Sequence, residues 1–424
     1  MSSMNKTPII TFVVALITVF AKAAPRPPAG PRLRDIVAEN YPNGNVLIGA
    51  TTGCWAFGQN QGALMDREFS YVTPENDFKQ SIVHPDPDTW NWSRSDPWKE
   101  HIIENRQVLR MHCPVSPQCS NWAKDDSRTA EELERNMREF VTEICRRYNG
   151  RPGFQYMDVV NETVVNGQWH KNKPGNGWEC PWFKIGQDTD FRRTPLYIKY
   201  AFEMANEYAP DVKLIYNQHE REMNADSWNL IKDTIRYLRD QGLRVDGIGW
   251  QAHVHAGWDT RYNLNKLSEL IQWAHANDLE FHITEASAFV SNNSASQFEL
   301  QAQTYRNILA VLLNERQNGR VGWNTWHISD AHGWRRDEYP SLFDDRYAPK
   351  PAYYVVQAEL MAHQDLRGDF NLDRQVDMLD FSYLAAGWLE EVSIFEPVDL
   401  YANGQVDMAD YAIFSRYWLT TQQP

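Results

Sequence analysis

Two glutamates stand at the ends of apolar segments that have the pattern of buried strands. Glu162 closes the segment 154–162, and Glu285 closes the segment 279–285. A carboxylate at the tip of a buried strand is costly unless it is solvated, paired or used in chemistry. Two carboxyl groups that face one cleft are the groups that cleave a glycosidic bond. The sequence therefore predicts a sugar-cleaving site, provided that the fold brings both strand ends together.

The segments around these glutamates alternate between strand and helix patterns. Helices are expected at residues 129–148, 196–208, 225–241, 263–276 and 295–317. Eight strands are expected at residues 46–50, 71–74, 108–112, 156–162, 213–218, 247–253, 280–285 and 321–327. Eight strand–helix units favour an α/β fold of the (β/α)8 TIM-barrel type, here assigned to residues 33–365, over an open sheet. Such barrels carry their chemistry at the C-terminal ends of the strands, where both glutamates fall.

Composition narrows the choice of partners. The formal net charge is −14, which argues against nucleic acid and against an anionic membrane surface, because both need a basic face. The chain is 13% aromatic and contains 17 tryptophans. Aromatic side chains often stack on sugar rings in a cleft, but tryptophan also fills large cores, so composition alone leaves both interpretations open.

The N-terminus has the pattern of an export signal. Lys6 precedes an apolar run at residues 9–20, and a small-x-small motif ends at Ala23. The run is short for a membrane span. We expect a signal peptide at residues 1–23, a proline-rich linker at 24–32, and a mature protein that is secreted and has no membrane contact.

Five cysteines make a poor disulfide framework for a chain of 424 residues. Cys113 and Cys119 could close a small loop, which an exported protein would permit, and the sequence leaves their disulfide state open. Cys54, Cys145 and Cys180 are expected to be buried or unpaired. The spacing of cysteine and histidine is not that of a zinc site.

An internal repeat follows the barrel segment. Two twelve-residue acidic loops, at 369–380 and 399–410, each precede a helical stretch, and together they predict a small all-α calcium-binding domain at residues 366–421. Tyr401 replaces an oxygen ligand in the second loop, so we expect that loop to bind more weakly. The alternative is a pair of solvated acidic turns. The expected calcium ligands are Asp369, Asn371, Asp373, Asp377 and Asp380 in the first loop, and Asp399, Asn403, Asp407 and Asp410 in the second.

Residues 367–420, with two repeats of a loop and one helix, resemble a type I dockerin. The resemblance implies a calcium-dependent module that docks onto a cohesin-type scaffold protein and attaches the enzyme to a scaffold or cell surface. The alternative is that the repeats only stabilise the protein.

From about Leu33 to His363 the chain resembles the family 10 glycoside hydrolases, which are retaining endo-β-1,4-xylanases. Several motifs in one shared order make this resemblance specific. They are Thr73-Pro74-Glu75-Asn76-Asp77-Phe78-Lys79, Asp158-Val159-Val160-Asn161-Glu162, Asp246-Gly247-Ile248-Gly249-Trp250-Gln251-Ala252-His253, Ile283-Thr284-Glu285, Trp326-His327-Ile328-Ser329-Asp330 with Trp334, Leu342-Phe343-Asp344 and Pro349-Lys350-Pro351-Ala352-Tyr353.

The resemblance implies cleavage of internal β-1,4 bonds of xylan, or of a related plant cell-wall polysaccharide, without a cofactor. Glu162 would be the general acid/base and Glu285 the nucleophile. Asn161 would reach the 2-hydroxyl of the sugar in the −1 subsite, and His253 would hydrogen-bond the nucleophile. The implied substrate-binding residues are Glu75, Asn76 and Lys79 on the glycone side, His112 and Gln251 beside the scissile bond, and Trp326 and Trp334 as walls of the −1 subsite.

The chain also departs from the family pattern. Met111, Gln218 and Ala286 stand where the family has other residues, and a tryptophan- and glycine-rich insertion follows the acid at about 169–183. These changes affect the walls of the sugar-binding subsites more than the catalytic residues. The sequence therefore leaves open which xylan decoration is preferred and how long the products are. The alternatives are the same fold acting on another β-glucan or a decorated xylo-oligomer, and a catalytically silent carbohydrate-binding protein. The presence of both glutamates argues against the silent protein.

Overall fold

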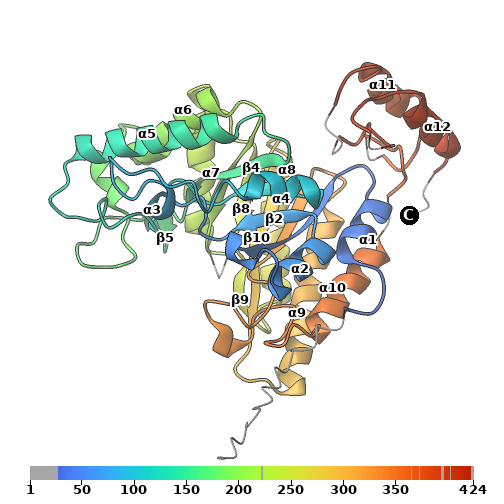
Figure 1. Ribbon diagram of the computed structural model, residues 1–424, viewed down its shortest axis with the longest axis horizontal. Coiled ribbons are helices and arrows are strands. Elements are labelled where there is room, and N and C mark those ends of the chain that lie inside the picture. The colour runs from blue at the N-terminus through green and yellow to red at the C-terminus, as the bar shows by residue number, and fades with distance from the viewer. Residues whose placement is uncertain are drawn as a thin grey trace, which may run out of the picture.

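Figure 1 shows the computed structural model, which describes residues 27–220, 223–363, 365–371, 373–392, 396–401 and 403–421. The expected signal peptide, at residues 1–23, lies outside the described residues, as does the start of the linker. None of the helices within the described ranges is long and apolar enough to cross a membrane.

Parallel strands form the centre of the molecule. Within the described ranges, eight of them pair in sequence order, and the last pairs back to the first, which closes a barrel. All eight predicted strands are present, and the predicted (β/α)8 barrel is confirmed. The barrel strands are β1 (Val46–Thr52), β2 (Tyr71–Pro74), β3 (Val108–Met111), β4 (Phe154–Asn161), β7 (Lys213–Gln218), β8 (Gly247–Trp250), β10 (Glu280–Phe289) and β11 (Val321–Thr325).

Helices surround this barrel (Figure 1). Helix α5 illustrates why they form: its buried residues, among them Leu133, Met137 and Phe140, recur at helical spacing, so one face packs on the core. Thr129 and Glu132 close its N-terminus with a reciprocal capping box. The helices that precede the tail are α1 (Leu33–Asn40), α2 (Asn60–Glu68), α3 (Gln80–Val83), α4 (Trp98–Glu104), α5 (Ala130–Tyr148), α6 (Leu196–Tyr208), α7 (Ala225–Asp240), α8 (Arg261–His275), α9 (Ala295–Asn314) and α10 (Pro351–Ala362).

The loops at the C-terminal ends of the strands carry extra structure. The loop after β4 contains a short hairpin of β5 (Val164–Val165) and β6 (Gln168–Trp169). The strand predicted at 247–253 is divided in two: β8 ends at Trp250 and β9 (His253–His255) begins after Ala252, whose φ of 58° interrupts extended backbone. Strand β9 then pairs with the extension of β10 beyond Glu285, so both elements lie at the same rim.

The C-terminal repeats fold around a small core of their own. Helices α11 (Met378–Ala386) and α12 (Met408–Tyr417) pack on a buried cluster that includes Val376, Leu384 and Phe414. Figure 1 shows these helices set apart from the barrel. One link between the two parts is Asn43, whose side-chain amide donates to the carbonyl oxygen of Leu366 over 3.1 Å. The boundary after residue 365 and calcium binding by this tail stay predictions.

All five cysteines lie within the described ranges, and each is a free thiol. No disulfide therefore joins Cys113 and Cys119 in this structure. The expectation that Cys54, Cys145 and Cys180 are unpaired is confirmed.

Candidate active site

A cleft of about 710 Å³ opens at the C-terminal ends of the barrel strands, and all eleven predicted catalytic and substrate-binding residues line it. They come from loops and strand ends that are far apart in the sequence, and the barrel brings them together. They are Glu75, Asn76, Lys79, His112, Asn161, Glu162, Gln251, His253, Glu285, Trp326 and Trp334.

Glu285 on β10 is a buried carboxylate with two side-chain partners. Its Oε1 accepts a hydrogen bond from the Asn217 amide over 2.9 Å, and its Oε2 lies 3.1 Å from His253 Nε2. Burial by itself raises the pKa of Glu285, but the bond to His253 and the charges of His112 and Arg110 outweigh burial and hold this pKa at about 2. Glu285 is therefore ionised at neutral pH.

The cations near Glu285 are fixed from below by Asp158. The Arg110 guanidinium donates to Asp158 Oδ2, and His112 Nδ1 lies 2.7 Å from the same oxygen. Burial lowers the pKa of His112, yet Cys113, Asp158 and Glu285 together raise it to about 10. The floor of the cleft thus holds fixed positive charge beside Glu285.

His253 is itself oriented by the strand ends. Its Nδ1 lies 3.1 Å from the Ser287 hydroxyl, and that hydroxyl donates to the Trp326 carbonyl oxygen over 2.7 Å. The imidazole is therefore held between Ser287 and Glu285, and the hydrogen bond to the carboxylate has a fixed direction.

Glu162 has different surroundings. It follows the last residue of β4 with φ of 58°, in the left-handed region that non-glycine residues seldom adopt and that recurs at functional sites. Its Oε1 accepts from the Gln251 amide over 3.0 Å, and its Oε2 accepts from the Trp178 indole over 2.7 Å. Both partners are neutral donors, whereas Glu285 faces cations.

Side-chain amides connect the two glutamates. Asn161 Oδ1 accepts from Asn217 Nδ2 over 2.9 Å and from Gln251 Nε2 over 3.1 Å. Asn217 also donates to Glu285, and Gln251 also donates to Glu162. This network fixes the position of one carboxylate relative to the other.

The loop after β2 supplies a polar wall. Lys79 Nζ donates to Asn76 Oδ1 over 2.8 Å and also to the Gln118 side chain. Glu75 Oε1 lies 3.2 Å from His327 Nε2. Burial acts to raise the pKa of Glu75, but His327 and Lys79 lower it overall, so Glu75 is a charged acceptor at neutral pH.

Two tryptophans after β11 form an aromatic wall. Trp326 is buried, and its ring lies 5.2 Å from the His112 ring. Trp334 is 54% exposed and stands 5.5 Å from the His253 ring. A wall of this kind presents apolar ring faces to a ligand in the cleft, next to the polar groups that would orient it.

Several lining residues were not predicted. Asn217 is fully buried and does not line the cleft; only the structure reveals its bond to Glu285, because the strand pattern at 213–218 predicts no side-chain partner. Trp178 lies within the insertion predicted at 169–183, which was the one available signal. The unpredicted lining residues are Gln118, Val165, Asn166, Trp178, His219, Glu220 and Asn224.

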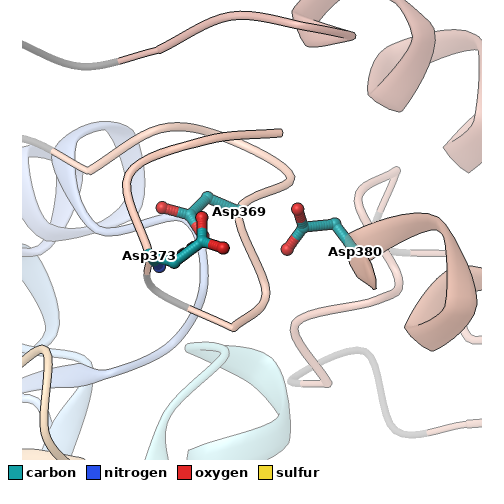
Figure 2. Close-up of side chains that lie close together, drawn as sticks. All are labelled: Asp369, Asp373 and Asp380. Carbon is teal, nitrogen blue, oxygen red and sulfur yellow. Dashed lines mark hydrogen bonds between the residues drawn. The ribbon is translucent and has the colours of Figure 1, made fainter. Parts of the chain in front are cut away.

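A second group of acidic residues lies in the tail, away from the cleft. Figure 2 shows the carboxylate of Asp380, in the first turn of α11, facing the loop that carries Asp369 and Asp373, whose carboxylates lie next to each other. Their carboxylate oxygens lie within 4.8 Å of one another, and within the described ranges this is the one group of three or more acidic, histidine or cysteine side chains placed to hold a metal ion. Oxygen ligands in such a cluster suit a hard cation such as Ca²⁺.

The other predicted calcium ligands are placed less directly. Asp377 and Asp407 cap α11 and α12, and each accepts a bond from the backbone two residues on. Asn371 Oδ1 accepts from the Asp373 amide over 3.1 Å. The ligands of the second loop (Asp399, Asn403, Asp407 and Asp410) form no group of three acidic side chains among the described residues.

The comparisons with known proteins match the barrel segment of the chain. The model of "Glycosyl hydrolase family 10" matches residues 37–359. Endo-1,4-beta-xylanase A of Caldicellulosiruptor saccharolyticus is 32% identical over 315 residues, which cover 69% of this chain and 87% of that protein.

Solved xylanase structures are similar to this chain over the same segment. The native xylanase 10B of Thermotoga maritima is 26% identical with a TM-score of 0.67, over 78% of this chain and 98% of that one. Xylanase 10B of Thermotoga petrophila RKU-1, in complex with xylobiose, is 25% identical with a TM-score of 0.68, over 80% of this chain and 99% of that one. The family match, the barrel and the paired glutamates concern the same segment, so this chain is a glycoside hydrolase that belongs to glycosyl hydrolase family 10.

Proposed function

We propose that the chain is a retaining endo-β-1,4-xylanase in which Glu285 is the nucleophile and Glu162 the general acid/base. The observation that carries this proposal is the contrast between the two carboxylates: the pKa of Glu285 is held at about 2, whereas Glu162 faces the neutral donors Gln251 and Trp178. A retaining glycosidase needs one carboxylate that stays ionised to attack and one carboxyl that gives and takes a proton. Xylan as substrate is supported by the similarity to xylanases, one of them solved with xylobiose.

The first step forms a covalent intermediate. A carboxylate oxygen of Glu285 attacks the anomeric carbon while the bond from that carbon to the glycosidic oxygen breaks. The departing oxygen takes the proton of Glu162, so the leaving sugar is released as a neutral alcohol. His253, which lies 3.1 Å from Glu285, keeps that carboxylate oriented toward the anomeric carbon, and Asn161 bonds the 2-hydroxyl of the same sugar.

The second step returns the enzyme to its initial state. Glu162, now ionised, takes a proton from a water molecule, whose oxygen attacks the anomeric carbon. The bond to Glu285 breaks, and that carboxylate regains its charge. Two inversions at one carbon give net retention. Glu75, Asn76 and Lys79 bind the glycone side, His112 and Gln251 lie beside the scissile bond, and Trp326 and Trp334 wall the −1 subsite.

The test is reducing-sugar release from purified xylan, mixed-linkage glucan and cellulose by the full chain, with Glu162→Ala and Glu285→Ala as controls. We expect release from xylan that is lost in both variants. Release of reducing sugar from the glucan but not from xylan would show that the substrate is another β-glucan. Release from none of the three would favour a carbohydrate-binding protein.

We further propose that the tail binds Ca²⁺ through its first loop and that it is dockerin-like, with a cohesin-type scaffold protein as partner. The charge of three converging carboxylates supports cation binding at Asp369, Asp373 and Asp380, because a bound cation would relieve their mutual repulsion. Binding of a cohesin module in Ca²⁺ but not in chelator, measured by calorimetry, tests the partner.

We also propose that the protein is secreted. The signal pattern at residues 1–23 supports export, and N-terminal sequencing of protein recovered from the medium of an expressing bacterial culture is the test. A mature chain that begins at Ala24 is the expected result. Retention of residues 1–23 in protein held in the cytoplasm would contradict the proposal.

A further inference from the structure

The insertion after β4 places one tryptophan directly on the candidate acid. We propose that Trp178 is a positioning residue for Glu162, and that His170 holds it there. This inference rests on the proposed function, because it takes Glu162 to be the general acid/base. It concerns a residue of the insertion by which this chain departs from the family pattern.

The contact fixes the plane of the carboxyl group. Trp178 Nε1 donates to Glu162 Oε2 over 2.7 Å, while Gln251 Nε2 donates to Oε1 over 3.0 Å. The terminal torsion of a glutamate side chain is broad, so a single donor leaves the carboxyl group free to rotate. Two donors, one on each oxygen, define its orientation.

The chemistry of the indole suits this role. An indole N–H is a donor only, and it does not take up a proton. It can therefore hold a carboxyl oxygen while Glu162 is protonated before the first step, and again while Glu162 is ionised before the second. A hydroxyl or imidazole at the same place would instead exchange protons with the acid.

His170 connects the two ends of this interaction. Its Nδ1 lies 3.0 Å from the Glu162 carbonyl oxygen, and its Nε2 lies 3.0 Å from the Trp178 carbonyl oxygen. His170 is 3% exposed, and its ring lies 4.5 Å from the Trp178 ring.

Further contacts fix the approach of the loop. The Trp178 backbone N–H donates to Asn176 Oδ1 over 3.0 Å, and Lys124 Nζ donates to the Gly177 carbonyl oxygen over 2.5 Å. On the other side, the Trp178 ring lies 5.2 Å from the ring of His219, which follows β7. Trp178 is nevertheless 39% exposed and lines the cleft, so its N–H is presented to Glu162 from a supported loop.

The expected effect falls on proton delivery. A general acid must lie within hydrogen-bond reach of the oxygen that it protonates. If Trp178 aims Glu162, its loss harms those substrates whose leaving group needs a proton. It spares substrates whose leaving group departs as a stable anion.

The test compares Trp178→Phe with Trp169→Phe in the full chain. Trp169 lies in the same insertion, is buried, and donates its indole N–H to the Arg192 carbonyl oxygen over 2.9 Å, so the control makes the same chemical change away from Glu162. The probes are aryl β-xylobiosides that range from a dinitrophenyl to an unsubstituted phenyl leaving group, and kcat/KM is measured for each. For Trp178→Phe we expect about a tenfold loss with the phenyl substrate and little loss with the dinitrophenyl substrate.

Trp169→Phe should follow the wild type across the series. An equal loss for all leaving groups in Trp178→Phe, no loss at all, or the same selective loss in Trp169→Phe would each overturn the inference. Glu162→Ala, measured on the same series, separates this inference from the function on which it rests. Its losses should be larger and more dependent on the leaving group, and a flat response of Glu162→Ala would refute the role of Glu162 itself.

Discussion

Among the described residues, the carboxylates around Glu285 in the cleft and those around Asp369 in the tail have opposite electrostatic surroundings. In the cleft, His253, His112 and Arg110 hold the pKa of Glu285 at about 2 despite burial. In the tail, burial and the charges of Asp380 and Asp373 raise the pKa of Asp369 to about 6. The first cluster brings its own cations, whereas the second consists of like charges.

The two groups of carboxylates obtain their counter-charges in different ways. Cations built into the protein stabilise a carboxylate that must stay charged during a reaction, and they leave its oxygens free to attack a substrate. Like charges without such partners favour binding of an external cation, which then becomes the largest local charge. The two clusters should therefore respond separately to substitution, to calcium and to pH.

Removing a carboxylate from the cleft should reduce turnover far more than removing one from the tail. Glu285→Ala should lower turnover of xylan by at least about 10⁴-fold, because the residue that attacks the anomeric carbon is gone. The matched change Asp369→Ala should leave turnover unchanged. Reducing-sugar release by both variants, with folding checked by circular dichroism, makes the comparison. Near-native activity of Glu285→Ala would refute the nucleophile assignment.

Replacing Arg110, the buried cation beneath the cleft, should have the next largest effect, and this effect should be on stability. Arg110 and Asp158 are both fully buried, and Arg110→Met leaves the Asp158 charge without that partner. We expect the free energy of unfolding to fall by about 3–5 kcal/mol. Denaturant titration of the full chain measures this loss. In the control, Arg306→Met breaks a pair whose arginine is 57% exposed, and it should cost less than about 1 kcal/mol.

Much of this barrel could be predicted because each of its strands is a short apolar run between turns. The predicted strand boundaries were less accurate near the candidate active site. Glu162 and Ala252 both have positive φ, which ends β4 and separates β8 from β9, and the strand pattern does not reveal such backbone conformations. Strand β10 also continues past Glu285 to Phe289, because β9 pairs with this extension.

The site was predictable where ordered motifs named the residues, as for Glu75 or Gln251. It was not predictable where a contact depends on the path of a loop. Trp178 reaches Glu162 through the turn built by His170, and no periodicity encodes that path. In the tail, the spacing of the first loop predicted Asp369, Asp373 and Asp380 as members of one metal-binding group, and the structure brings these three together. The spacing did not show that Asp377 caps a helix.

Removal of calcium should affect the tail alone. At a thousandfold excess over its dissociation constant, a bound ion adds about 4 kcal/mol to the stability of the part that binds it. We expect chelator to speed hydrogen exchange of amides in α11 and α12 of the full chain and to leave the barrel strands unchanged. Unchanged exchange in α11 would argue against the metal site.

The same cluster should make the calcium-free tail sensitive to pH. With its pKa raised to about 6, Asp369 in the folded tail binds a proton that the unfolded chain releases near pH 4. Without calcium, stability should therefore fall as pH rises from about 4 to about 6. Calcium should remove this trend, and hydrogen exchange of α11 across that pH range is the measurement.

Replacing His253, the histidine that bonds Glu285, should have a smaller effect on activity. In His253→Ala the hydrogen bond that lowers the pKa of Glu285 is lost, so this pKa rises and more of the carboxylate is protonated in acid. The acid limb of the kcat/KM profile should move to higher pH, with about a 10- to 100-fold loss at pH 4 and less at pH 7. His255→Ala, an exposed position on the same strand, should keep the wild-type profile. An unshifted acid limb in His253→Ala would contradict the electrostatic role.

The smallest effect should come from the second acidic loop. Asp399 accepts hydrogen bonds from the backbone N–H groups of Asn403 and Gly404, as Asp369 does from its own loop, but Tyr401 takes the place of an oxygen ligand. With fewer charges around the ion, this loop should bind Ca²⁺ more weakly than the first. Calorimetric titration of the full chain should show two classes of site, of which Asp369→Asn removes the tighter and Asp399→Asn the weaker. If Asp399→Asn removed the tighter class, charge count would not set affinity here, and the difference between the two loops would have to rest on geometry.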